Sequence, residues 1–278
     1  KLTAKNITAG SAAALNAGTA LTAQNITAGG GLNAKAKNIT VSNVGAGSNA
    51  TLNAETVLTA QHISVGGSLN AKAVKMKAHD IKADGAATLN ADAELSAKNV
   101  NVGGNADITA GTNLTAHDVS VGGDLNAKAK NITVSNVTGK GNVDLTAGQN
   151  AKLGGKTDVG ETLTANVGKD FVTNGAVTTG KELIANVGND LAVNDLVSAG
   201  GSASLTVGRN ATLGGALTTG GNFTANVAHD LIVNDAVTTG ADFAAIVGNN
   251  AVTNGIVTTH GALKWNVGND LTAHAAVL

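Results

Sequence analysis

The sequence predicts an all-β protein, a right-handed parallel β-helix with three short strands in each coil. Three observations predict it: a repeat of 19–20 residues along the whole chain, alternation of apolar and polar residues within each repeat, and Gly or Asn at fixed places between the alternating segments. The 278 residues then divide into about 14 coils. At roughly 4.8 Å per coil, the stack would be on the order of 65 Å long.

The repeat is strictest in the second half, where one period separates each residue from its equivalent without a slip, as from Val167 to Val187 to Val207. Apolar residues recur in columns, and we expect each column to form a ladder of like side chains inside the coils. The predicted core ladders are Leu163, Leu183, Phe223, Phe243 and Leu263; Val167, Val187, Val207, Val227, Val247 and Val267; and Val177, Val197, Leu217, Val237 and Val257.

The first half repeats with a slightly shorter period. Segments such as "LTAKNITAG" and "LTAQNITAG" begin at Leu2, Leu21, Leu58, Leu95 and Leu114, so the spacings are one or two units of roughly 19 residues. We therefore expect 19-residue coils over residues 1–141 and 20-residue coils over residues 142–278. No Pro-rich or charged linker intervenes, which predicts one continuous solenoid.

Alternation with a period of two predicts strands of about three to six residues, each with one buried face. Gly and Asn tolerate positive φ, so we expect them to form the corners between these strands. The predicted corners are Gly168, Gly188, Gly208, Gly248 and Gly268, and Asn174, Asn194, Asn234 and Asn254. Pro is absent, as expected where every strand is flanked by two others and a proline would remove a ladder hydrogen bond.

Composition excludes several classes of function. The net charge is −1, only four residues are aromatic, and the excess of Lys in residues 1–141 is small, so we expect no nucleic-acid partner. There is no Cys, which excludes disulfides and thiolate metal sites. No run approaches 18 apolar residues, so no helical membrane span is predicted. The chain starts at Lys1 without a signal peptide, so we expect it to be part of a longer protein.

The repeats resemble those of a known family. "LTAQNITAGGGLNAK" in the first half and "GNDLAVNDLVSAGG" in the second are similar to repeats of filamentous haemagglutinin-type exoproteins of two-partner secretion systems in Gram-negative bacteria. The resemblance lies in repeat length, Gly/Asn corners and Leu/Val columns, and covers essentially the whole chain. It implies export through an outer-membrane partner to the cell surface. There the coils would form the shaft of an adhesin or of a contact-dependent growth-inhibition toxin.

Candidate catalytic and metal-binding residues are few. The six His residues occupy polar or corner positions, and the pairs His79-Asp80 and His117-Asp118 recur two coils apart, about 10 Å, too far for one zinc ion. No nucleophile elbow is present, and the only Arg is Arg209. We therefore expect no enzyme, catalytic residue, metal or cofactor.

Three further patterns in the sequence each suggest a hypothesis. Asn-x-Thr triplets, such as the one at Asn25, are possible glycosylation sites or a product of strand alternation. Paired threonines such as Thr178-Thr179 could match an ice lattice, but alternation lets only one of each pair face outward. Trp265 stands in a column that is mostly Ala and is expected to fill space near a local irregularity.

The sequence thus predicts a structural shaft of a large secreted bacterial surface protein, which holds a binding or toxic tip away from the cell. Two alternatives stay open. The repeat surface itself could bind a glycan or ice, or the chain could self-associate into fibres through open coil ends. A host or neighbouring-cell receptor would be met by regions outside this segment.

Overall fold

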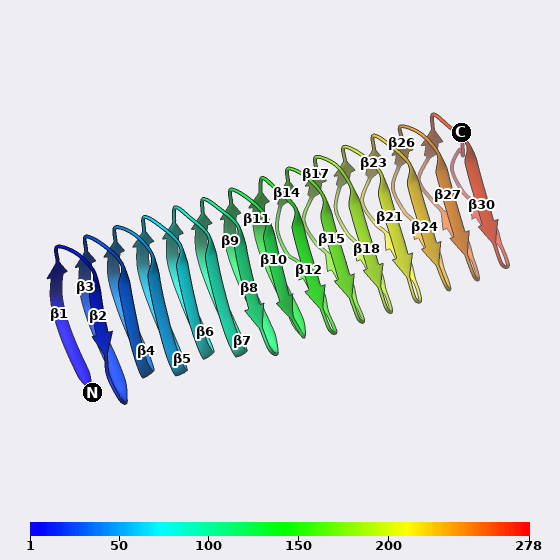
Figure 1. Cartoon of the computed structure of the whole chain (residues 1–278). Coiled ribbons are helices and arrows are strands. Elements are labelled where there is room, and N and C mark those ends of the chain that lie inside the picture. Colours follow the sequence, from blue (N-terminus) through cyan, green and yellow to red (C-terminus); the bar gives the residue numbers. More distant parts are fainter. The chain divides into compact units, whose positions relative to one another are not determined.

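The computed structural model describes all residues 1–278 and contains strands but no helix. Its strands stack in parallel to form a β-solenoid of about 14 turns, which confirms the predicted fold class (Figure 1). No helix long and apolar enough to cross a membrane is present. The chain divides into two compact units, unit 1 with residues 1–130 and 138–140, and unit 2 with residues 131–137 and 141–278. Each is described by itself.

Unit 1 is built from strands of 4 to 16 residues. They are β1 (Leu2–Ala9), β2 (Ala13–Asn16), β3 (Ala20–Ala28), β4 (Leu32–Ala46), β5 (Ala50–Val65), β6 (Leu69–Ala83), β7 (Ala87–Val102), β8 (Ala106–Ala110), β9 (Asn113–Val121) and β10 (Leu125–Ala129). Strand β11 (Asn131–Gly139) has its first seven residues in unit 2.

The prediction of strands no longer than about six residues is wrong for unit 1, where β5 and β7 each have 16 residues. The chain bends within these strands at single residues in the left-handed region, with φ between 51° and 57°. Only one residue leaves the ladder at such a bend, so the pairing continues on both sides of it. The bend residues are Asn6, Asn25, Asn43, His62, Asp80, Asn99 and Asp118, with Asn136 at the equivalent place in β11.

Strand pairing in unit 1 uses two slightly different steps. Leu21 pairs with Ile39 and Ile39 pairs with Leu58, so the second step is one residue longer than the first. The extra residue is absorbed where the register shifts, between the Ala36–Ala54 and Asn38–Val57 pairs. The two steps together carry the chain from Leu21 to Leu58, which are the starts of two similar segments in the sequence.

Unit 2 has three short strands per coil, as predicted. The five-residue strands are β12 (Val143–Ala147), β15 (Leu163–Val167), β18 (Leu183–Val187), β21 (Ala203–Val207), β24 (Phe223–Val227), β27 (Phe243–Val247) and β30 (Leu263–Val267). The three-residue strands on the second side are β13 (Ala151–Leu153), β16 (Phe171–Thr173), β19 (Leu191–Val193), β22 (Ala211–Leu213), β25 (Leu231–Val233), β28 (Ala251–Thr253) and β31 (Leu271–Ala273). Those on the third side are β14 (Thr157–Val159), β17 (Val177–Thr179), β20 (Val197–Ala199), β23 (Leu217–Thr219), β26 (Val237–Thr239) and β29 (Val257–Thr259).

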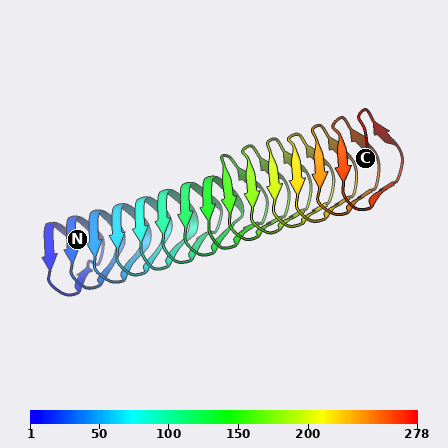
Figure 2. The same cartoon turned by 90° about the horizontal axis from the view of Figure 1, so that it is seen from above.

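The register of unit 2 explains the strict period of its sequence. Val143 pairs with Leu163, Leu163 with Leu183 and Leu183 with Ala203, so the step is the same each time. Every strand therefore lies beside its own equivalent in the next coil, as successive strands in Figure 2 show. This pairing places like side chains on top of one another.

The predicted Gly and Asn corner residues of unit 2 lie between strands, but the expectation that they use positive φ is wrong. No glycine in the chain has positive φ, and neither do Asn174, Asn194, Asn234 and Asn254. Close backbone approach explains the glycines instead. A Cβ on Gly188 would collide with the carbonyl oxygen of Gly168, and one on Gly208 would collide with that of Gly188. Successive coils approach closely at these two glycines, whereas Ala228 occupies the same column two coils after Gly188.

Candidate functional surfaces

The predicted ladder residues point into the coils of unit 2. All of them are buried except Leu263 and Val267, which are half-buried in β30, a strand with a single partner, β27. Three aromatic side chains of unit 2 form a short stack, in which Phe223 and Phe243 are buried and Trp265 is half-buried. The rings of Phe223 and Phe243 are 5.2 Å apart, and the ring of Trp265 lies 4.8 Å from that of Phe243. The two phenylalanines serve packing, and the indole N–H of Trp265 has no hydrogen-bond partner.

Some corner asparagines bond to their own copies. The side-chain amide of Asn194 donates to that of Asn174 at 2.8 Å, and Asn254 donates to Asn234 at 2.9 Å. Gly214 interrupts this column. In an exposed amide ladder of this kind each side chain satisfies part of its neighbour, which stabilises the stack. These asparagines therefore link successive coils by side-chain hydrogen bonds. The spacing in the sequence predicted corner positions but not these bonds.

A second ladder joins side-chain oxygens to backbone N–H groups. Asp190 Oδ1 accepts from the backbone N–H of Asn210 at 3.1 Å, and Asp230 Oδ1 accepts from the backbone N–H of Asn250 at 3.0 Å. The Gly-x-Asp/Asn signature marks this column in the sequence, and its function as an N–H acceptor for the next coil was missed.

Hydrogen bonding lowers the pKa of Asp230 below its ordinary value. The largest cause is the backbone N–H of Asn250; the side chains of Asn249 and Asn250 and the charge of His229 act in the same direction, while desolvation opposes them. These donors favour the ionised carboxylate. The hydrogen bonds of this ladder account for the direction of the shift.

The histidines are spread over the surface. The register sets Lys98 between His79 and His117, so these two histidines are two coils apart. His62 Nε2 lies 3.2 Å from Asp80 Oδ2, and Asp80 is itself a bend residue that accepts from Asn99 Nδ2 at 2.6 Å. No group of three or more His, Cys, Asp or Glu side chains is close enough to hold a metal ion.

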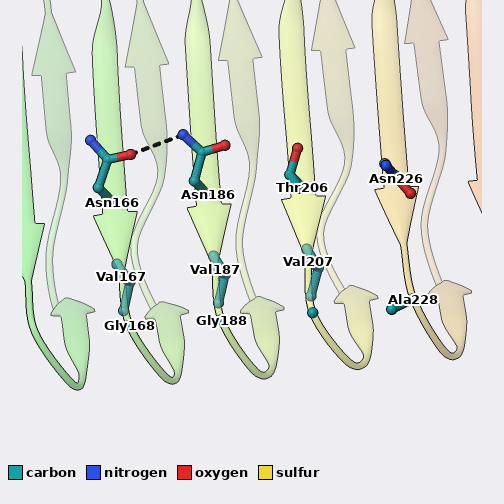
Figure 3. Close-up of a pocket in the computed structure, with 11 residues that line it drawn as sticks. Asn166, Val167, Gly168, Asn186, Val187, Gly188, Thr206, Val207, Asn226 and Ala228 are labelled. Carbon is teal, nitrogen blue, oxygen red and sulfur yellow. Dashed lines mark hydrogen bonds between the residues drawn. The ribbon is translucent and has the colours of Figure 1, made fainter.

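One hollow lies along unit 2, beside the ends of β15, β18, β21 and β24. Its volume is about 620 Å³, and no charged residue lines it. Figure 3 shows its amide row, in which Asn186 donates to Asn166 at 2.9 Å before Thr206 interrupts the ladder. The glycine corners at Gly168 and Gly188 form its edge, so the hollow follows from the missing side chains of that column.

A smaller groove of about 360 Å³ crosses β5, β6, β7 and β9 in unit 1. Lys75 and Glu94 form an ion pair of 3.2 Å within it, and Lys77 lies between the hydroxyl-bearing residues Thr59 and Ser96 of the adjacent coils. It is the more polar of the two hollows. Its ammonium, carboxylate and hydroxyl groups could hydrogen-bond a polar ligand.

The paired threonines divide as strand alternation requires. Thr179, Thr219 and Thr239 are buried, whereas Thr178, Thr218 and Thr238 lie on the outer surface. Each of these coils therefore presents one threonine outward, and these threonines form a single row along this side of unit 2.

The chain matches no protein-family model, no curated protein and no solved structure.

Proposed function

We propose that this chain is a shaft segment of a large secreted bacterial surface protein, an adhesin or exoprotein that extends a binding or toxic tip from the cell. The observation that carries this proposal is the register. Each strand of unit 2 pairs only with its equivalents one coil away, and the strands are joined by short corners without inserted loops. A chain built in this way gains length with every coil and adds no new site.

Burial supports a purely structural role. The interior is filled by Leu, Ile, Val, Ala, Phe and one Met, and the few buried polar residues are all threonines. Enzymes need convergent polar groups in a pocket, with perturbed pKa values matched to the reaction. Neither hollow described above is lined by a residue with a shifted pKa. We propose that the chain is not an enzyme.

The resemblance to filamentous haemagglutinin-type repeats supplies the setting for this proposal: export through an outer-membrane partner and display at the cell surface. Solenoid stability is approximately a sum of coil terms and nearest-neighbour terms. Coils can therefore form one after another as the chain emerges, and each new coil favours outward movement.

Proline substitution tests this coupling. In cells that express the complete surface protein with its secretion partner, Val187→Pro should reduce surface display strongly, because proline breaks the ladder and clashes at a buried position. Val187→Ala keeps the backbone N–H and serves as the matched control, with display near that of the parent. Equal display of the proline variant and the parent would contradict export driven by coil stacking.

A binding module is the second candidate function, and the groove at Lys75, Lys77 and Glu94 is the observation that favours it. The 278-residue chain should be tested on a glycan array beside a Lys77→Ala variant. A plain shaft shows no saturable binding. Saturable binding that Lys77→Ala removes would assign the function to the groove instead.

A further inference from the structure

Two neighbouring outward columns of unit 2 contain no charged residue over five successive coils, although Asp195 and Asp235 border the first column one residue earlier. They consist of the outward residues of β17, β20, β23, β26 and β29 and of the residue before each strand, and are together called the threonine face below. Its members are Ala176, Thr178, Leu196, Ser198, Ala216, Thr218, Ala236, Thr238, Ile256 and Thr258. The preceding coil ends this run with the ion pair of Lys156 and Asp158.

The face consists of straight rows. Backbone hydrogen bonds of 2.8–2.9 Å run from Val177 to Leu196, Val197 to Ala216, Leu217 to Ala236 and Val237 to Ile256. The residues before the strands are therefore stacked in one column, and the Thr/Ser residues form a second column beside it. Glycines at 180, 200, 220 and 240 border the second column.

Two side chains project from this otherwise low surface. Leu196 is 42% exposed and Ile256 is 48% exposed, while Ala176, Ala216 and Ala236 fill the rest of their column with methyl groups. The order along the column is therefore small, large, small, small, large.

We propose that the threonine face pairs with the same face of a second copy of this chain, in antiparallel orientation. A two-fold axis along the strand direction sets each column opposite itself and reverses the order of the coils. With the axis at the coil of Ala216, Leu196 lies opposite Ala236 of the other copy, and Ile256 lies opposite its Ala176. Both contacts occur twice, because a two-fold interface uses the same patch on both copies.

This central register is the one that keeps all five coils of the face in contact, and in the same register each large side chain meets an alanine. A second copy also has the same spacing between coils, so the rows stay matched along the whole face. Identical ladders that pack against one another in this way form dry, interdigitated interfaces.

The size of the face predicts a weak, reversible pair. Five coils at roughly 4.8 Å and five residues of strand at roughly 3.3 Å give about 400 Å² per copy. Stable interfaces bury about 800 Å² per partner, so we expect a dissociation constant in the high micromolar range.

Sedimentation velocity of the 278-residue chain, at concentrations up to about 1 mM, tests the pairing. The weight-average mass should rise from 27.0 kDa toward twice that value. Leu196→Ala should raise the dissociation constant about tenfold, and Ala236→Leu should weaken pairing by opposing two leucines. The double variant exchanges the large and small residues in the same register, and pairing should return to near the parent level.

Ile246 gives a matched control, because it is 48% exposed like Ile256 but belongs to β27 on another side of the coil. Ile256→Ala should weaken pairing and Ile246→Ala should not. An equal effect of both variants, failure of the double variant to recover, or a mass of one chain at every concentration would overturn the proposal.

Cross-linking tests the register directly, since the chain has no cysteine of its own. With a short bis-maleimide, Thr218→Cys should link to itself across the axis. Thr178→Cys should link to a copy with Thr258→Cys but not to itself. Self-linking of Thr178→Cys would show a parallel arrangement or another register, and the proposed pairing would be wrong.

Discussion

Two buried threonines of unit 2 have different hydrogen-bonding environments, and the same substitution should change stability in opposite directions at the two sites. Thr173 and Thr219 each end a three-residue strand and are 3% and 2% exposed. Thr219 Oγ1 donates to the carbonyl oxygen of Gly221 at 2.9 Å, whereas Thr173 Oγ1 has no hydrogen-bond partner. Valine has nearly the same shape as threonine, so Thr→Val changes mainly the hydroxyl group.

The expected magnitudes follow from these partners. An unsatisfied buried hydroxyl costs about 1–3 kcal/mol, so Thr173→Val should raise the free energy of unfolding by about 1–2 kcal/mol. The Val193 and Val233 side chains in the same column show that valine fits there. Thr219→Val removes a made hydrogen bond and leaves a carbonyl with one partner fewer, so it should lower stability by about 1 kcal/mol.

Urea unfolding followed by far-ultraviolet circular dichroism measures both variants against the parent chain. The midpoints should move apart, upward for Thr173→Val and downward for Thr219→Val, with similar slopes. A lower midpoint for Thr173→Val, or equal shifts of the same sign, would refute the reasoning from hydroxyl satisfaction.

Two further predictions concern the aromatic stack and the acidic ladder. Phe243→Ala should lower the free energy of unfolding by about 3–5 kcal/mol, and Phe243→Leu by much less, because Leu163, Leu183 and Leu263 occupy the same column. Fluorescence of Trp265, whose ring lies 4.8 Å from Phe243, reports the transition, and equal losses for both variants would contradict the packing argument. For Asp230, the lowered folded pKa means that its contribution to stability is present above the unfolded-state pKa of about 3.9 and is lost as pH falls through the folded value. Asp230→Asn should flatten the dependence of unfolding free energy on pH in that range, and an unchanged slope would exclude the proposed ladder as its source.

Sequence periodicity predicts most of unit 2. The columns at Val167 and Val177 give the register, and alternation gives the buried face of each strand, because a strand in a stacked coil must repeat its pattern one coil later. The same logic failed at the bends of unit 1. A single left-handed residue such as Asn25 or Asp80 lets one strand continue around a corner, and no local pattern in the sequence distinguishes that bend from a break between two strands.

Contacts between side chains of different coils were harder to predict. Fixed Asn and Asp columns were visible in the sequence, but they read equally well as turn residues. Whether Asn194 donates to Asn174, or Asp190 accepts a backbone N–H, depends on the distance between neighbouring coils. The threonine column of the threonine face was visible in the sequence, but the column of Ala, Leu and Ile beside it was not singled out there.

The constant register of unit 2 also bears on how such a chain can change over generations. Removing residues 184–203, for example, would leave Leu183 followed by Ser204, and each remaining residue would keep its column because Ser204 pairs one coil on from Ile184. Removal of one residue fewer would turn every later side chain to the opposite face. Recombination between repeats can therefore lengthen or shorten this protein freely, provided that it exchanges whole repeats.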